Sequence, residues 1–215
     1  MKKTNIILSY SGIDGSGKTS IIDGVSDALQ KKGHKTRYIW LRYNHYFTKL
    51  LLVFCRLIGL TSYHTVDGVR IGHHDFYKSK TISYLFIFLT YIDTLITTFF
   101  LVYIPRFFTD TVIVCDRWVL DILIDLEIDT RLNLTNTFVS RIFLALIPAD
   151  AKCFVIYRDY DSVLNARDDH KIDKNFERRY KLYYSESYER FQIINNTKSL
   201  DDVINEAINM VVTSD

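Results

Sequence analysis

The sequence has few of the residues that interrupt regular structure: of its 215 residues only 2 are proline and 8 are glycine. Disordered tails and low-complexity linkers need a different composition, because here 48% of the residues are hydrophobic. No internal repeat or linker divides the chain. We therefore expect residues 1–215 to form a single folded domain.

Charge of one sign is not in excess either. Lysine and arginine total 27 and aspartate and glutamate 25, which gives a formal net charge of +2. Proteins that coat nucleic acids carry a large basic excess, and solvating tails carry an acidic one. The balance argues against nucleic acid as a partner, so partners have to be predicted from local motifs.

Cysteine is scarce as well. The chain has three, Cys55, Cys115 and Cys153, which are odd in number, far apart and set in apolar runs. A disulfide framework or a cysteine zinc site would need pairs at short spacing. We expect buried thiols in a reducing compartment. The first residues do not resemble a secretion signal, so a cytoplasmic location is the expectation.

One long hydrophobic run is present. From Ile82 to Ile104 the only charged residue is Asp93, and the run is long enough to cross a bilayer. Serine and threonine residues interrupt it, and it lies between two parts of one alternating pattern of strands and helices. We therefore interpret it as a long buried helix, with a membrane span as the alternative.

Short β-branched runs alternate with longer segments of helical period. The strand candidates are Asn5 to Tyr10, Thr36 to Leu41, Thr111 to Cys115, Ala151 to Tyr157 and Gln192 to Asn195. This alternation predicts an α/β fold with a parallel five-stranded sheet and helices on both faces. The first helix should stop at Gly33, and Ser199 should cap the last one.

A glycine-rich motif lies between the first predicted strand and the first predicted helix. Glycines let successive backbone N–H groups turn towards a phosphate, and a helix N-terminus adds partial positive charge. The motif, which fits G-x-x-x-x-G-K-[ST], reads Gly12-Ile13-Asp14-Gly15-Ser16-Gly17-Lys18-Thr19. We expect it to bind ATP, with Lys18 at the β- and γ-phosphates and the Thr19 hydroxyl on Mg²⁺.

The third predicted strand ends in Asp116-Arg117-Trp118. Ligands of open α/β sheets bind at the carboxyl ends of the strands, so Asp116 is a second candidate on the metal side. The alternatives are a capping or turn role for Asp116 and a structural ion pair for Arg117.

Two classes of nucleotide-binding protein can be tested from motifs. A GTPase needs an Asn-Lys-x-Asp sequence to recognise guanine, and none occurs; His170-Lys171-Ile172-Asp173 lacks the asparagine. The signature helix of transporter ATPases is also absent. A small kinase needs only the phosphate loop, an acceptor pocket and a lid that carries arginines.

Three motifs support the kinase class: residues 11–19, Asp116-Arg117-Trp118 and Ala166-Arg167. In these motifs and their order, over almost the whole chain, the sequence resembles the thymidylate kinase family. The resemblance implies a P-loop NTP hydrolase type of fold with a short lid at about residues 167–179. It also implies ATP and Mg²⁺ as cofactors, dTMP or another nucleoside monophosphate as the nominal acceptor, and a homodimer.

The resemblance also assigns roles by position. Asp14 would contact the acceptor and Arg42 would hold its phosphate, while Asn196 lies where related kinases hold adenine. The expected nucleotide contacts in the loop are Gly12, Asp14, Gly15, Ser16, Gly17, Lys18 and Thr19. The cations expected to act on the transferring phosphoryl group are Lys18, Arg117 and Arg167.

The acceptor half departs from the family pattern. Arg42 is followed by Tyr43-Asn44 instead of x-Pro, and the arginine that normally grips the base has no counterpart around Tyr91. Two extra acids, Asp121 and Asp125, would repel an anionic nucleotide unless they are paired or turned away. We expect Tyr91 and both acids at the acceptor.

Three interpretations of function stay open. The chain is a nucleoside monophosphate kinase, a related phosphotransferase that acts on a hydroxylated or lipid-linked glycan, or a nucleotide-binding module with weak ATPase activity. The apolar run and the segment Leu50 to Leu60 suit either a dimer interface or peripheral membrane contact. The neighbouring His73 and His74 would line the acceptor pocket or lie in a surface loop.

Overall fold

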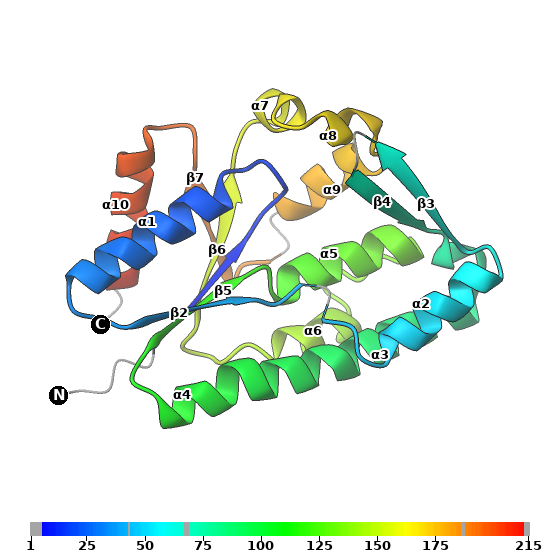
Figure 1. Cartoon of the computed structure of the whole chain (residues 1–215), viewed down its shortest axis with the longest axis horizontal. Helices are drawn as coiled ribbons and strands as arrows, with labels where there is room; N and C mark the ends of the chain where they lie inside the picture. The colour runs from blue at the N-terminus through cyan, green and yellow to red at the C-terminus, as the bar shows by residue number, and fades with distance from the viewer. Residues whose placement is uncertain (1–5, 43, 67–68, 186–187, 213–215) are drawn as a thin grey trace.

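The computed structural model describes residues 6–42, 44–66, 69–185 and 188–212. The strands are β1 Ile7–Ser11, β2 Thr36–Trp40, β3 Thr61–Val66, β4 Val69–His74, β5 Val112–Asp116, β6 Lys152–Tyr157 and β7 Phe191–Asn195. The helices are α1 Lys18–Lys31, α2 Thr48–Leu57, α3 Lys80–Thr98, α4 Ile104–Phe108, α5 Val119–Thr130, α6 Phe138–Leu144, α7 Tyr160–Asn165, α8 Asp168–Ile172, α9 Phe176–Tyr183 and α10 Leu200–Val212. Figure 1 shows their arrangement.

Five strands form one sheet in the order β2-β5-β1-β6-β7. Every neighbouring pair in it is parallel; Ile7 pairs with Ile113 on one side of β1, and Leu8 with Lys152 on the other. The predicted parallel five-stranded sheet is therefore confirmed. The first predicted strand was to begin at Asn5, which lies outside the described residues.

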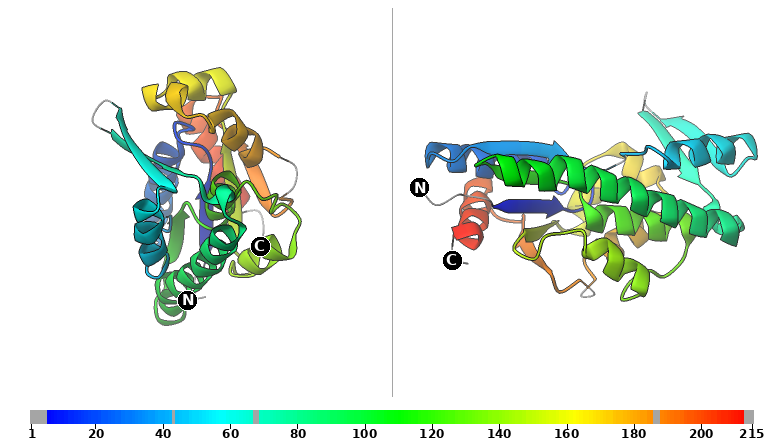
Figure 2. Two further views of the ribbon diagram at one scale, coloured as in Figure 1. Left: turned by 90° about the vertical axis from the view of Figure 1, so that its right-hand side faces the viewer. Right: turned by 90° about the horizontal axis from the view of Figure 1, so that it is seen from below.

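Helices cover both faces of the sheet, as the two views in Figure 2 show. Successive strand residues point to opposite faces. On β1, Leu8 packs with α1 and α10 in one buried cluster, and Ile7 packs in the other cluster with α3, α5 and α6. The α/β architecture with two hydrophobic layers follows from this alternation. All three cysteines are free and buried, as expected.

The signals for the first and last helices are confirmed. α1 ends at Lys31 and is followed by Gly33, whose φ of 87° is a conformation that glycine adopts easily. The hydroxyl of Ser199 accepts a hydrogen bond from the N–H of Asp202, at 3.3 Å, in the first turn of α10. The two helices lie on the same face of the sheet, where α1 contacts α10 in one buried cluster.

The apolar run forms a continuous helical segment, α3, the π-helical turn η2 Phe99–Tyr103 and α4. Judged by length and composition alone, Lys80–Phe108 could cross a membrane, and 44% of its most apolar stretch is buried. Asp93, in its middle, is 1% exposed and accepts hydrogen bonds at 2.9–3.0 Å from the N–H groups of residues 46–48. This carboxylate caps the start of α2. One face of the helix is therefore built into the protein.

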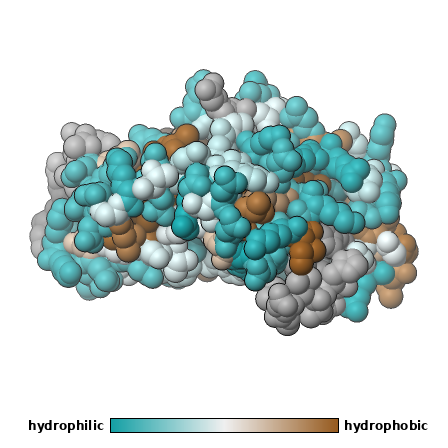
Figure 3. All heavy atoms as spheres, turned by 90° about the horizontal axis from the view of Figure 1, so that it is seen from above, coloured by the Kyte–Doolittle hydropathy of each residue, from teal (hydrophilic) through white to brown (hydrophobic). Residues whose placement is uncertain are grey.

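The segment between β2 and α3 was not predicted in detail. Leu50 to Leu60 contains α2, which is followed by the antiparallel hairpin of β3 and β4. The hairpin was missed because its strands are rich in polar residues and lack the apolar core pattern of the sheet. The upper face of the molecule in Figure 3 is mostly hydrophilic, with several separate hydrophobic patches, one of them at the right-hand end.

Candidate functional site

Residues 12–17 form a tight loop between β1 and α1. Gly12 has a φ of 146°, and a Cβ there would lie 3.0 Å from the carbonyl oxygen of Ile156. Gly17 has a φ of 90°, and a Cβ there would overlap the side-chain amide of Asn196. Only glycine fits these two positions without strain, so the sequence motif produces a compact loop of bare backbone.

Lys18 reaches back into this loop from the first turn of α1. Its Nζ donates hydrogen bonds to the carbonyl oxygens of Gly12, at 2.7 Å, and Ile13, at 2.8 Å. The residue is buried, and burial together with the neighbouring charge of Arg117 lowers its pKa to about 7. The ammonium group therefore sits in the centre of the loop, where a bound anion would gain from its charge.

Two side chains from other parts of the chain hold the loop. Asn196, after β7, donates to the carbonyl of Ser16 at 2.7 Å, and Arg158, after β6, donates to the carbonyl of Gly15 at 3.0 Å. The expected contact of Asn196 with adenine stays a prediction. Arg158 was not among the predicted site residues, because only the fold shows that the end of β6 lies against the loop.

Asp116 lies at the carboxyl end of β5 and lines the same cleft as Thr19. One oxygen, Oδ2, accepts a hydrogen bond from the Tyr38 hydroxyl at 2.7 Å. The other, Oδ1, is buried and has no partner among the described residues. A free carboxylate oxygen and the Thr19 hydroxyl are hard ligands of the kind that Mg²⁺ prefers, so these residues fit the ion.

Within the described residues no group of three or more histidine, cysteine or acidic side chains could hold a metal ion. Mg²⁺ at this place would therefore depend on phosphate oxygens for its remaining ligands, as in nucleotide complexes. Tyr38 was not predicted from the sequence. In the pairing of β2 with β5, Tyr38 lies opposite Val114, two residues before Asp116, and its hydroxyl reaches the Asp116 carboxylate.

Arg117 follows Asp116 with a φ of 57°, a left-handed conformation that costs a non-glycine residue energy. The strained turn points the guanidinium under the phosphate loop. There it donates to the carbonyl of Gly12 at 3.2 Å, to Asp121 at 3.1 Å, and to Asp14. Tyr183 also donates to Asp121, at 2.6 Å. Backbone strain at this position is therefore offset by buried polar contacts.

Ion pairs continue from Arg117 across the site. Arg42 lies 3.7 Å from Asp14 and holds Asp125 with two hydrogen bonds, of 2.7 and 2.8 Å, and Arg179 also binds Asp125. The result is an alternating series of charges, which we call the arginine–aspartate chain: Asp121, Arg117, Asp14, Arg42, Asp125 and Arg179. Its three cations and three anions balance.

The pKa values follow from these contacts. Burial alone would raise the pKa of Asp125, but the charges of Arg42 and Arg179 bring it down to about 2. Burial likewise opposes ionisation of Asp14, yet Arg117 and other nearby cations lower its pKa below the ordinary value. Both carboxylates are therefore ionised at neutral pH and are compensated by arginine.

A cleft of about 1210 Å³ surrounds the phosphate loop. Among the described residues that line it, eight are arginine or lysine and six are aspartate. Arg167, at the start of the predicted lid segment 167–179, lines the cleft and holds Asp169 with two hydrogen bonds of 2.9 Å. We call this space the donor cleft, since it contains the phosphate loop.

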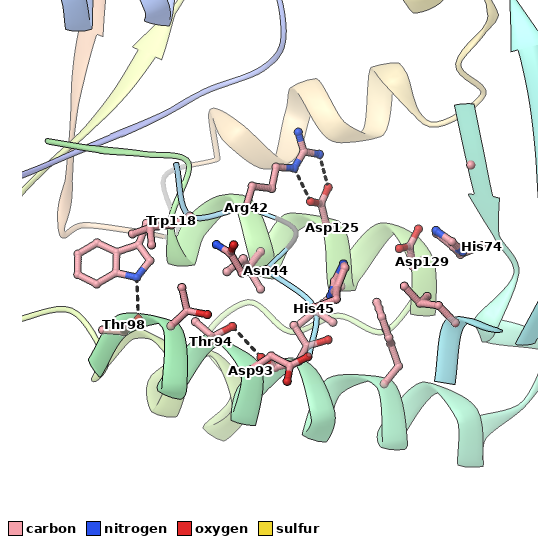
Figure 4. A pocket seen from close by; sticks show the side chains of 18 of the residues that line it. Arg42, Asn44, His45, His74, Asp93, Thr94, Thr98, Trp118, Asp125 and Asp129 are labelled. Carbon is pink, nitrogen blue, oxygen red and sulfur yellow. Dashed lines mark hydrogen bonds and ion pairs between the residues drawn. The ribbon is translucent and has the colours of Figure 1, made fainter. Parts of the chain in front are cut away.

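A second cavity, of about 390 Å³, lies between α3 and α5. Figure 4 shows it from close by: Arg42 and Asp125 are joined at one side, Thr94, Thr98 and Asp93 line α3, and Asp129 and His74 lie towards one end. Five residues line both this cavity and the donor cleft: Arg42, Gly72, His74, Asp129 and Arg179. The two spaces therefore meet at these residues.

The structure brings only some of the predicted acceptor residues to the cavity. Arg42 and Asp125 line it. Asp121 is fully buried beside Arg117, and Tyr91 packs its ring on Phe143, with centroids 5.3 Å apart. Tyr91 is turned away because it follows Thr90, which faces the cavity, by one residue of helix. Asp129, which lines both spaces, was not predicted.

His73 and His74 are consecutive residues of the hairpin strand β4. His74 lies in β4, lines both spaces and stacks on Phe76 with ring centroids 5.0 Å apart. The side chain of His73 lies outside the described residues. The interpretation of His74 as a pocket residue agrees with this position.

No protein-family model and no curated protein matches the sequence. Solved structures do match it, among them a thymidylate kinase from Ehrlichia chaffeensis determined at 2.15 Å resolution. The match covers 96% of this chain and 98% of that one, with 13% sequence identity and a TM-score of 0.50. At this identity the similarity shows the fold alone. The chain has a P-loop α/β fold similar to that of thymidylate kinase, as the sequence predicted.

Proposed function

We propose that the protein transfers the γ-phosphoryl group of ATP to a small-molecule acceptor. One observation carries the proposal: the phosphate loop with Lys18 at its centre opens, at Arg42 and Asp129, onto a second cavity of about 390 Å³. A protein that only bound nucleotide would have no use for a separate cavity that meets the phosphate site.

Each residue of the donor cleft has its own role in the proposed phosphoryl transfer. The backbone N–H groups of the loop hold the phosphates, and Lys18 exchanges its carbonyl partners for phosphate oxygens. Arg117 donates to the same loop and adds charge beside the transferring group. Thr19 and Asp116 would hold Mg²⁺, which neutralises phosphate charge and orients the triphosphate. The reaction needs little else than positioning and charge.

Arg167 supports a closing lid. It is 45% exposed in its side chain and is held by Asp169 within the same segment. Movement of the lid over the cleft would bring this guanidinium to the phosphates and exclude water, which protects the transferring group from hydrolysis.

The test is ATP consumption by the purified protein with Mg²⁺ and a panel of acceptors. The Lys18→Ala variant should lose at least about 100-fold in turnover, as expected for a cation that stabilises the transition state. Lys31→Ala, at the other end of the same helix, is the matched control. Equal turnover in both variants would refute the assigned donor site.

A nucleoside monophosphate such as dTMP is a second candidate for the acceptor. The observation in its favour is Arg42, which the family resemblance assigns to the acceptor phosphate and which lines the junction of the two spaces. Turnover with dTMP would require the ion pair of Arg42 with Asp125 to open. ATP hydrolysis without any response to acceptors would instead indicate a nucleotide-binding module.

We also propose that a second copy of the chain covers the exposed apolar side chains of α2 and α3. Leu50, Leu57 and Phe88 are 73%, 81% and 58% exposed, which is unusual for a monomer surface. Light scattering should give twice the mass of one chain, and Leu57→Asp should reduce it. A monomer that binds lipid vesicles would favour membrane contact instead.

A further inference from the structure

The cavity between α3 and α5, which we call the acceptor cavity, differs from the donor cleft in the partners of its cations. Arg42 and Arg179 are the arginines that line it, and both bind the carboxylate of Asp125. Arg42 also lies near Asp14, so each guanidinium belongs to the arginine–aspartate chain. An acceptor phosphate entering here would have to compete with carboxylates that are already ionised and well placed.

The charge balance of the lining leads to the same conclusion. Two arginines and three aspartates are among the described residues that line the cavity. The Asp93 carboxylate accepts hydrogen bonds from N–H groups at the N-terminus of α2, and the Asp125 carboxylate forms ion pairs with the two arginines. The cavity therefore has no positive charge in excess, and a dianionic group gains nothing by leaving water for it.

The remaining polar groups are neutral and suit hydroxyl groups. Thr90, Thr94 and Thr97 line the cavity from one face of α3. The Thr94 hydroxyl donates to the carbonyl of Thr90, but the hydroxyls of Thr90 and Thr97 are buried and have no partner within the described residues. A buried hydroxyl without a partner costs free energy that a bound ligand can return by hydrogen bonding.

His45 and Trp118 complete the uncharged lining. Burial lowers the pKa of His45 below its ordinary value, so its ring is neutral near pH 7. The indole N–H of Trp118 donates a hydrogen bond to the hydroxyl of Thr98, at 3.1 Å. The cavity thus offers neutral donors and acceptors beside apolar walls, which is the lining expected for an uncharged ligand that carries hydroxyl or amide groups.

Asp129 stands outside the arginine–aspartate chain and lies where the cavity meets the donor cleft. Phosphoryl transfer must take place at such a junction, because the acceptor oxygen comes from one space and the γ-phosphorus from the other. A phosphate oxygen is already deprotonated at neutral pH, but an alcohol has to lose a proton as it attacks. Only an alcohol acceptor would make use of a carboxylate at this place.

We propose that the acceptor is an alcohol without negative charge that binds in this cavity, and that Asp129 takes the proton of its hydroxyl. The proposal rests on the proposed function. As the alcohol oxygen bonds to the γ-phosphorus, the bond from that phosphorus to the bridging oxygen of ADP breaks. The hydroxyl proton passes to the Asp129 carboxylate and is then released to water. The products are a phosphate monoester and ADP.

The ionisation of Asp129 fits a general base. Burial and then the charge of Asp125 raise its pKa to about 8, while Arg179 and Arg42 act in the opposite direction. Asp173, between α8 and α9, raises it further, and His74 of β4 lies at the same end of the cavity. Asp129 is therefore mostly protonated at pH 7 and acts as a base through its ionised fraction, which grows as the pH approaches 8. A base with a pKa close to the working pH transfers protons efficiently.

The first test measures ADP formation by the full chain with Mg²⁺ and ATP. Nucleosides, hexoses and polyols, and amino alcohols form three arms, and dTMP and the other nucleoside monophosphates form a fourth. We expect turnover in at least one of the three alcohol arms and none in the monophosphate arm. Turnover confined to the monophosphates would overturn the alcohol proposal and leave the kinase function intact.

Absence of turnover in every arm would also overturn the proposal. ATP binding then decides separately about the donor site: wild-type protein that binds ATP where Lys18→Ala does not retains the donor assignment. The two failures are therefore distinguishable.

The second test replaces Asp129 by asparagine, which keeps its size and removes its basicity. With the alcohol substrate, kcat should fall by about 100-fold or more, while the Kd for ATP stays unchanged. With ATP saturating, so that the bound triphosphate keeps Lys18 protonated, the wild-type kcat/KM for the alcohol should rise with pH and level off above about 8. This rise should be absent in Asp129→Asn and retained in Asp201→Asn, an exposed control in α10.

A merely structural role for Asp129 makes a different prediction. The variant would then lose stability or substrate affinity, but its remaining activity would keep the wild-type pH profile. An Asp129→Asn protein with kcat within a few-fold of wild type, or with an unchanged profile, would show that this carboxylate is not the base.

Discussion

The donor cleft and the acceptor cavity both contain cations, but these cations meet different partners. In the donor cleft, Lys18 and Arg158 donate to backbone carbonyls of the phosphate loop, at 2.7 to 3.0 Å. In the acceptor cavity, Arg42 and Arg179 donate to the carboxylate of Asp125. A carbonyl is a dipole and leaves most of the positive charge available, whereas a carboxylate cancels it.

The difference shows why a count of basic residues does not predict anion binding. Arginine near a pocket attracts phosphate only if its charge is not already compensated. Here the cations of the donor cleft donate to uncharged carbonyl groups, whereas the cations of the cavity are neutralised by a carboxylate, although both lie within one network of residues.

The largest effect should come from removing Arg117, the cation of the arginine–aspartate chain that lies between Asp121 and Asp14. In Arg117→Ala the buried Asp121 and the neighbouring Asp14 lose their shared cation. An uncompensated buried carboxylate costs about 3–5 kcal/mol, which urea denaturation would register as a lower free energy of unfolding. Arg117→Lys, which keeps the charge, should recover part of the loss. A cost below about 1 kcal/mol in the alanine variant would contradict the central position of Arg117.

Removal of one carboxylate should make the cavity resemble the donor cleft. In Asp125→Asn, Arg42 and Arg179 lose their common anion, and we expect the affinity for inorganic phosphate or dTMP to rise by about tenfold or more, equal to about 1.4 kcal/mol. Calorimetric titration measures it, with Asp201→Asn as the control. Unchanged affinity would mean that pairing with Asp125 does not govern the charge of the cavity.

We also predict that the donor cleft takes up protons when a triphosphate binds. Because the pKa of Lys18 is lowered to about 7, its amine is mostly neutral at pH 8 in the free protein. The charge of a bound triphosphate raises that pKa, so binding should take up about one proton at pH 8 and very little at pH 6. Calorimetry in buffers of different ionisation enthalpy measures the uptake. Lys18→Ala should abolish it, and a persisting uptake would assign the proton to another group.

The smallest effect should come from Tyr38, which donates to Asp116 from the edge strand β2. Tyr38→Phe should lower the free energy of unfolding by about 1 kcal/mol or less, because the tyrosine is 54% exposed. It should also raise, by a few-fold, the Mg²⁺ concentration needed for half-maximal ATP turnover. Tyr46→Phe, equally exposed and outside both spaces, is the control. An identical Mg²⁺ response in both variants would remove Tyr38 from the site.

The donor half could be predicted from sequence because its determinants are local. The glycines, Lys18 and Thr19 are consecutive, and the flanking strand and helix have clear periodicity. A parallel sheet then brings Asp116 to the same edge, since carboxyl ends of parallel strands meet there. The three central strands, β1, β5 and β6, were found because buried strands of a parallel sheet are continuous apolar runs.

The acceptor half could not be predicted because its contacts join distant residues. Arg42 and Asp125 are separated by 83 positions, and Arg179 reaches the same carboxylate from α9. From the sequence we could identify Asp121 and Asp125 and expect them to be paired or turned away, but only the fold shows which arginines pair with them. Asp129 gave no signal, since a single aspartate near the end of a helix is common.

Asp93 has a consequence for the chain before it is folded. The segment Lys80–Phe108 has the length and composition of a membrane-spanning helix, and Asp93 lies near its middle. An aspartate there opposes insertion into a bilayer by about 2.5–3.5 kcal/mol. Its hydrogen-bond donors, the N–H groups of residues 46–48, precede it in the chain and have been synthesised before it emerges. The carboxylate that caps α2 therefore also favours folding of the nascent helix against its own protein over its transfer into lipid.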